Sequence, residues 1–152
     1  MPIAITLHVL AAVIWVGGMF FAYVALRPAA AAMLELPQRA PLWSRVLVRF
    51  FPWVWAAVIV LPATGYWMIL WVFEGFANVK LHVHIMQATG AAMILIFLYI
   101  YFSPYPRMKR ALAADDFPAA GRELGRIRRL VGLNLVFGLI TIADATGGAY
   151  WW

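Results

Sequence analysis

Four long apolar segments separated by polar ones dominate the chain. They lie at about residues 3–26, 51–72, 81–102 and 130–150. Each is long enough to cross the hydrocarbon core of a bilayer, which takes about 20 apolar residues. A helix is the expected form, because backbone polar groups in lipid must find their partners within their own segment. The pattern predicts an all-α integral membrane protein, a four-helix bundle that forms one transmembrane domain over residues 1–152.

The composition agrees with this pattern and excludes several classes of site. Hydrophobic residues make up 66% of the chain and charged residues only 12%, whereas soluble domains carry about 25% charged residues. The net charge of +6 does not indicate a nucleic-acid partner, because the basic residues gather between the apolar segments. The chain has no cysteine, which excludes disulfides, thiolate metal sites, iron–sulfur clusters and covalently attached c-type haem.

The basic residues predict the orientation in the membrane. Every Lys and Arg except Lys80 lies within residues 27–50 or 103–129, two segments that are expected to be loops. The positive-inside rule places these loops in the cytoplasm, so both termini are expected to be periplasmic. An aromatic belt at the outer interface is then expected from Trp67, Trp71, Tyr150, Trp151 and Trp152.

The second polar segment contains "DDFPAAGRELGRIRRL", which predicts a short helix leading into the fourth span. Asp116 is placed to cap this helix, and proline follows in its first turn. Arg122, Arg126 and Arg129 share one face of it. This face favours either contact with anionic lipid or an ordinary solvated surface.

A weak internal repeat predicts two parallel helical hairpins, residues 1–72 and 73–152. "LHVLAAVIWVGG" in the first span resembles "LHVHIMQATGAA" in the third. "LPATGYW" near the end of the second span resembles "ADATGGAYW" near the end of the fourth. The repeat makes His8 and His82 equivalent positions and leaves His84 as an additional residue.

The three histidines of the chain are expected in one layer near the outer ends of the spans, and Asp144 lies at a similar depth. Ionisable residues inside a bilayer usually face the bundle interior and mark functional sites. One interpretation is haem b with His8 and His82 as axial ligands. Room for the macrocycle would come from small residues of three spans, namely Gly17, Gly18, Ala88, Gly90, Ala91 and Gly138.

A second interpretation is a copper site built from His8, Asp144 and either His82 or His84, with Met86 as a soft ligand. His82 and His84 cannot both point at one ion from a regular helix, because two residues correspond to about 200° of rotation. A third interpretation is that these polar residues only set helix depth and bond to their neighbours.

Each interpretation implies a different function. Haem implies electron transfer or a small redox reaction with a quinone or a periplasmic partner, and so a membrane haem oxidoreductase. Copper ligation implies a copper-binding or copper-transport protein, and a packing role implies a non-catalytic accessory subunit. Small-residue faces on four spans are also compatible with a homodimer in the lipid bilayer.

Four stretches of the chain resemble a known family. They are "LHVLAAVIWVGGMFFAYVALRPAA", "RFFPWVWAAVIVLPATGYWMI", "VHIMQATG" and "RIRRLVGLNLVFGLITIA". Over nearly the whole chain they resemble the small four-helix members of the copper-resistance protein D (CopD) family. This resemblance implies a role in copper uptake or resistance at the bacterial cytoplasmic (inner) membrane.

The arrangement also resembles HemJ-type protoporphyrinogen oxidases, which are four-helix proteins that bind haem b. His8 and His82 match the histidines of that family, and the resemblance therefore implies haem binding. His84 stands where that family has its functional lysine.

Overall fold

The computed structural model describes residues 1–151, without the side chains of Ala149 and Trp151, and Trp152 lies outside the described residues. The helical elements are α1 (Pro2–Phe20), the π-helix η1 (Phe21–Leu26), α2 (Arg27–Met33), α3 (Leu36–Trp71), the 3-10 helix η2 (Phe76–Asn78), α4 (Leu81–Phe102), α5 (Pro104–Ala113) and α6 (Phe117–Trp151). Residues 1–151 contain no β-strand.

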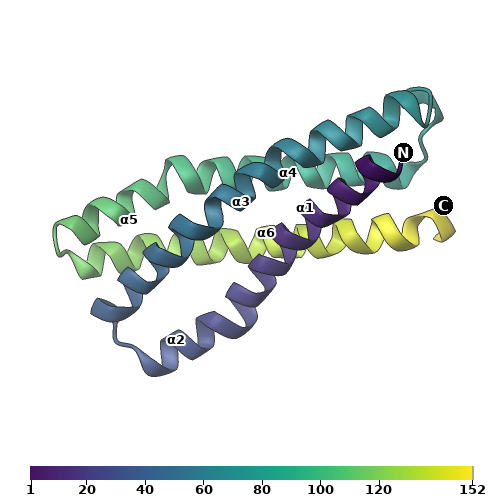
Figure 1. The fold of residues 1–152 in the computed structure, drawn as a ribbon. Coiled ribbons are helices and arrows are strands. Elements are labelled where there is room, and N and C mark those ends of the chain that lie inside the picture. The colour runs from purple at the N-terminus through teal and green to yellow at the C-terminus, as the bar shows by residue number, and fades with distance from the viewer. Residues whose placement is uncertain (152) are drawn as a thin grey trace.

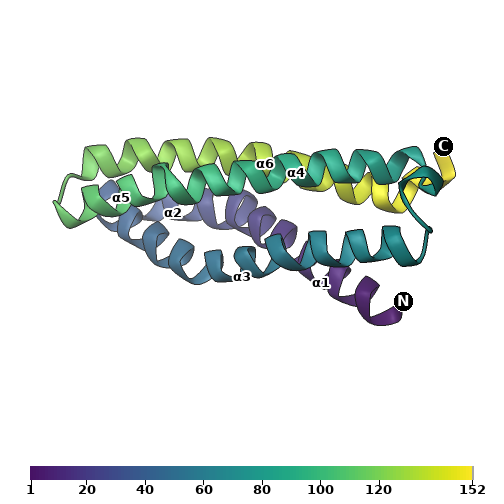
Figure 2. The same ribbon diagram turned by 90° about the horizontal axis from the view of Figure 1, so that it is seen from above.

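These elements form four rods that lie along one another (Figures 1 and 2). Four helices are long and apolar enough to cross a membrane, namely Pro2–Met33, Leu36–Trp71, Leu81–Ala113 and Phe117–Gly148. The predicted all-α, four-helix membrane bundle is therefore confirmed, and the chain is a multi-pass membrane protein. Both chain ends and the connection between α3 and α4 lie at one end of the bundle, which we call the terminal end (Figure 1).

The two segments that were expected to connect the spans as loops, 27–50 and 103–129, are mostly helical, well beyond the one short helix that the sequence predicted. At the end opposite the terminal end, only residues 34–35 and 114–116 separate the rods (Figure 1). The charges of these segments exclude them from hydrocarbon, but a helix can continue past the membrane boundary into water. At about 1.5 Å per residue, the 36 residues of α3 span about 54 Å, well beyond a hydrocarbon core of about 30 Å.

Local chemistry explains where these long rods bend and begin. Pro28 follows the π-helix η1, and its ring would meet the carbonyl of Val24 in a regular α-helix, so the wider π turn accommodates it. Asp116 caps α6, since the backbone N–H of Ala119 donates to its Oδ1 at 3.0 Å. The predicted N-cap is thus confirmed, although the helix it begins is continuous with the fourth span.

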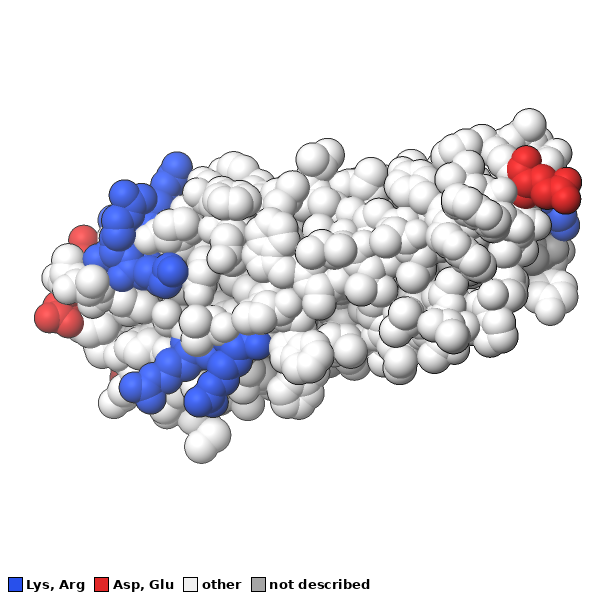
Figure 3. All heavy atoms as spheres, turned by 45° about the horizontal axis from the view of Figure 1, so that its top comes forward, with Lys and Arg blue, Asp and Glu red and all other residues white. Residues whose placement is uncertain are grey.

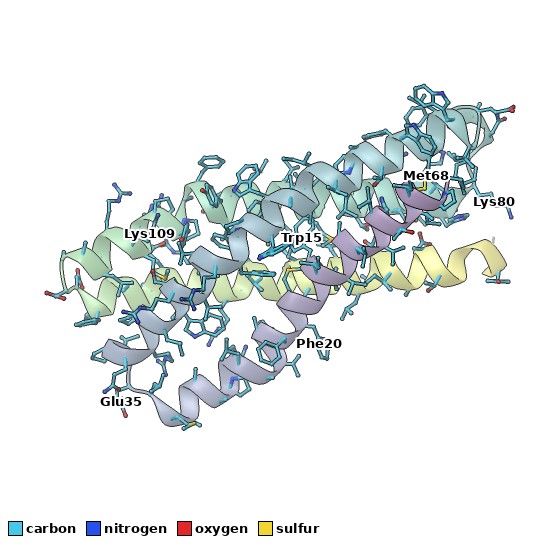
Figure 4. All side chains as sticks on the ribbon, viewed as in Figure 1. Trp15, Phe20, Glu35, Met68, Lys80 and Lys109 are labelled. Atoms are coloured by element: carbon cyan, nitrogen blue, oxygen red, sulfur yellow. The ribbon has the colours of Figure 1, made fainter. Side chains whose placement is uncertain are left out.

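Packing is closest within the two hairpins. α1 packs mainly on α3, and α4 packs mainly on α6. The centre of the bundle is filled by buried aromatic rings. Phe97 of α4 lies with its centroid 6.3 Å from the ring of Trp15, 5.5 Å from that of Phe51 and 5.3 Å from that of Trp55. Trp15 lies at the centre of the bundle within this cluster (Figure 4).

The ends differ in charge (Figure 3). Every Lys and Arg except Lys80 belongs to the half of the bundle around α2, α5 and the adjoining parts of α3 and α6, which we call the basic end. At the terminal end, Trp67 and Trp71 stack with centroids 6.2 Å apart, and Trp71 is 69% exposed. Exposed indole rings are what an interfacial belt requires.

Candidate metal centre

His8 lies half-buried between α1 and α3, two turns from the terminal end. Its Nδ1 is 2.8 Å from the Oγ1 of Thr64, and its ring lies against Gly65, where an added Cβ would be 3.4 Å from the imidazole Cε1. The two positions match in depth, because Thr64 lies about 10 Å from the end of α3 and His8 about 9 Å from the start of α1.

The tautomer of a neutral His8 ring depends on where the Thr64 hydroxyl sends its proton, and the shortest contact of that hydroxyl favours one tautomer. The Thr64 hydroxyl carries one proton, and it donates that proton to the carbonyl of Val60 at 2.6 Å. Thr64 Oγ1 must then accept from Nδ1–H of His8. The lone pair of the imidazole is therefore on Nε2. Metal-binding histidines usually share this arrangement, in which one ring nitrogen donates to a neighbouring group and the other binds the ion.

His82 occupies the corresponding place in the second hairpin, in the first turn of α4 against α6. An added Cβ on Gly148 would lie 2.6 Å from the Cβ of His82 and 2.9 Å from Oδ1 of Asp144. A side chain at this position would therefore collide with both residues, and glycine avoids this. His8 thus rests on the glycine of the "ATG" stretch at residues 63–65, whereas His82 rests on Gly148, which directly follows the "ATG" stretch at residues 145–147.

His82 and Asp144 each have one buried side-chain atom without a hydrogen-bond partner. These atoms are Nδ1 of His82 and Oδ2 of Asp144, and the Asp144 residue is only 6% exposed. A buried carboxylate without a partner is costly in an apolar environment. A cation bound by both atoms would satisfy them, which makes the two residues candidates for cation binding.

The neighbouring donors on α4 separate into two faces. Met86 is half-buried and lies one turn from His82 on the same face. His84 is exposed and points away from the bundle. Of the two histidines, His82 is therefore the more buried.

A polar seam continues from Asp144 toward the middle of the membrane. The Thr141 hydroxyl lies 2.7 Å from Oγ1 of Thr89 across the α4–α6 interface. Two turns further along α6, the buried Asn134 has an unpartnered Oδ1. Gly138 lies between Asn134 and Thr141 on α6. The side chains of Val16 and Met93 pack against it and would lie 2.8 and 3.2 Å from an added Cβ.

Replacement of Thr141 with valine is expected to destabilise the bundle slightly, by about 0.6 kcal/mol, because an interhelical hydrogen bond in lipid is lost. Thr146→Val is the matched control, since the exposed Thr146 hydroxyl bonds only within its own helix, to the carbonyls of Ile142 and Ala143. Unfolding in mixed micelles measures both. Equal effects of the two changes would contradict a role for the Thr89–Thr141 contact.

The structure brings together only part of the expected site. His82 and Asp144 meet at Gly148, whereas His8 lies with Thr64 in the other hairpin. Within residues 1–151, no three His, Asp or Glu side chains gather as a metal cluster. A copper set of His8, His82 and Asp144 is therefore not assembled in this arrangement.

The haem hypothesis gains no support from this geometry. The two histidines contact their own hairpin partners, and Val16 and Met93 fill the space at Gly138 that was expected to accommodate the macrocycle. Of the other glycines in that set, Gly17 and Gly90 have no side chain within 4 Å of an added Cβ, and Gly18 lies against the ring of Phe50.

The comparison with protein families shows the family of the chain. A family model described as copper resistance protein D matches residues 44–147, which is more than half of the chain. The chain belongs to this family. No curated protein and no solved structure gives a significant match.

The range matched by the CopD model contains some of the candidate ligands of this chain and not others. It includes His82, Met86 and Asp144, and it excludes His8. The resemblance of the chain to CopD proteins is confirmed, and the resemblance to HemJ-type oxidases stays a prediction.

Gly148, Thr64 and Gly65 were not identified from the sequence as parts of the site. The available signal was the repeated "ATG" at residues 63–65 and 145–147, which indicated the repeat but not its purpose, and Gly148 directly follows the second copy. Only the pairing of helices shows that these small residues receive the imidazole rings.

Proposed function

We propose that this protein is a copper-binding membrane protein that takes up the ion between α4 and α6 at the terminal end of the bundle. The observation that carries the proposal is the pair of buried, unpartnered atoms, His82 Nδ1 and Asp144 Oδ2, beside Gly148. The CopD family match over this region selects copper among the cations that such a pair could bind. Copper is here the cargo of the protein.

The donor set fits both oxidation states of copper. Imidazole nitrogen and carboxylate oxygen are typical ligands of Cu(II), and the thioether of Met86, one turn from His82, is a soft ligand that favours Cu(I). The carboxylate also contributes a negative charge in a region of low dielectric, which lowers the cost of holding a cation there.

His8 supplies a second donor at the same end of the bundle. Its Nδ1–H is held by Thr64, so its Nε2 lone pair is free to bind an ion. The polar seam of Thr89 and Thr141 begins below Asp144 and gives the ion a next contact toward the middle of the membrane. The proposed activity is therefore copper binding and passage, with both termini and the site on the outer side of the inner membrane by the positive-inside rule.

Asp144→Asn tests the proposal, since it removes the charge with little change in shape. Copper affinity of the purified protein in detergent, measured by competition with a chromophoric chelator, is expected to fall by about 10- to 100-fold. Asp115→Asn is the control, because it removes the same charge at an exposed turn of the basic end. A wild-type protein that binds no copper, or an Asp144→Asn variant that binds it as well as wild type, would overturn the proposal.

A further inference from the structure

A second candidate site lies at the basic end, far from the histidines and unrelated to copper. A surface pocket of about 240 Å³ is lined by Tyr99 of α4 and by Arg126, Arg129 and Leu130 of α6. It is situated where the polar part of α6 meets its apolar span, which begins at Leu130. Two guanidinium groups therefore border the boundary between headgroups and hydrocarbon.

The charge of the pocket is positive. Arg126 donates to Oε1 of Glu123 at 3.2 Å, an i,i+3 pair that holds this arginine in place. Arg129 forms no ion pair within residues 1–151. Two arginines against one carboxylate leave a net positive site with free N–H donors, which suits the oxygens of a phosphate.

The surface next to the pocket is apolar and runs toward the middle of the membrane. Leu95, one turn from Tyr99 on α4, is 66% exposed, and Leu133 and Ile140 on α6 are 47% and 48% exposed. Leu133 lies one turn beyond Arg129, and Ile140 two turns beyond Leu133, so they continue the face that carries the arginines. A free anion would leave this strip unused, whereas a lipid would cover it.

We propose that the pocket of Tyr99, Arg126, Arg129 and Leu130 binds the phosphate of an anionic phospholipid, with its acyl chains along Leu95, Leu133 and Ile140. The apolar strip selects a lipid over a soluble phosphate, and the excess positive charge selects an anionic headgroup over a zwitterionic one. The basic face of α6 thereby acts as a specific lipid contact in addition to marking orientation.

Native mass spectrometry of the full chain, titrated with phosphatidylglycerol or phosphatidylcholine in detergent, tests this site. Arg126→Gln/Arg129→Gln is expected to lower the affinity for phosphatidylglycerol by about 25-fold, since each arginine near anionic lipid contributes about fivefold. Its affinity for phosphatidylcholine should change less than about twofold. Arg110→Gln/Arg128→Gln is the matched control, because it removes the same charge from exposed positions outside the pocket.

Three outcomes would overturn the proposal. One is equal binding of the two lipids by the wild-type protein. Another is a loss of affinity in the control pair as large as that in the pocket pair, which would indicate only general surface charge. Displacement of phosphatidylglycerol by an equal concentration of inorganic phosphate would indicate an anion site without lipid specificity. Retention of the lipid against inorganic phosphate, with loss confined to the pocket pair, supports the site.

Discussion

His82→Ala is expected to lower the copper affinity of the protein by about 100-fold or more, a loss beyond the 10- to 100-fold caused by changes around metal ligands. His82 provides a buried, unpartnered Nδ1 beside Asp144, so its removal takes away the nitrogen donor of the site. Competition with a chromophoric chelator measures the change.

His84→Ala is the matched control for this change. This variant removes the same residue type two positions along α4. Because His84 is exposed, the copper affinity of the variant is expected to stay at the wild-type level. If the two alanine variants bound copper equally well, the buried pair could not be the site, and an exposed or unrelated set of ligands would have to be sought.

Gly148→Ala is expected to abolish tight copper binding although no ligand is changed. The added methyl would lie 2.6 Å from Cβ of His82 and 2.9 Å from Oδ1 of Asp144. One of these side chains must move, or α4 and α6 must separate, at a cost of about 1–3 kcal/mol for overpacking. Both copper affinity and unfolding in mixed micelles should therefore change.

Gly90→Ala is the control for the second prediction. Gly90 lies on α4 with nothing within 4 Å of an added Cβ, so neither packing nor copper binding is expected to change. Wild-type copper affinity in Gly148→Ala would show that the close approach of His82 to Gly148 has no part in binding.

Apolar segment length and charge were sufficient to predict the four spans, because both are set by the bilayer. Secondary structure outside the bilayer was not predictable in the same way. Arg45 and Arg126 lie in segments that are too charged for hydrocarbon. Each nevertheless belongs to a helix, α3 or α6, that extends from this segment into the membrane. Charge reports depth, and it leaves open whether a helix stops at the boundary.

The residue types of the candidate site could be predicted from the sequence, but which residues lie in contact with one another could not. Three histidines and Asp144 in one layer indicated a functional centre. Their division into two hairpins depends on which helices pack together, and α1 faces α3 while α4 faces α6. The periodicity of a helix could place His84 opposite His82, but it could not say which one faced the interior.

The most direct test of the central claim is the copper content of the purified wild-type chain and of the His82→Ala/Asp144→Asn variant, loaded with copper side by side and measured by elemental analysis. We predict one tightly held copper ion per wild-type chain and its loss in the double variant. Copper retained equally by both proteins, or absent from both, would contradict binding at the α4–α6 pair.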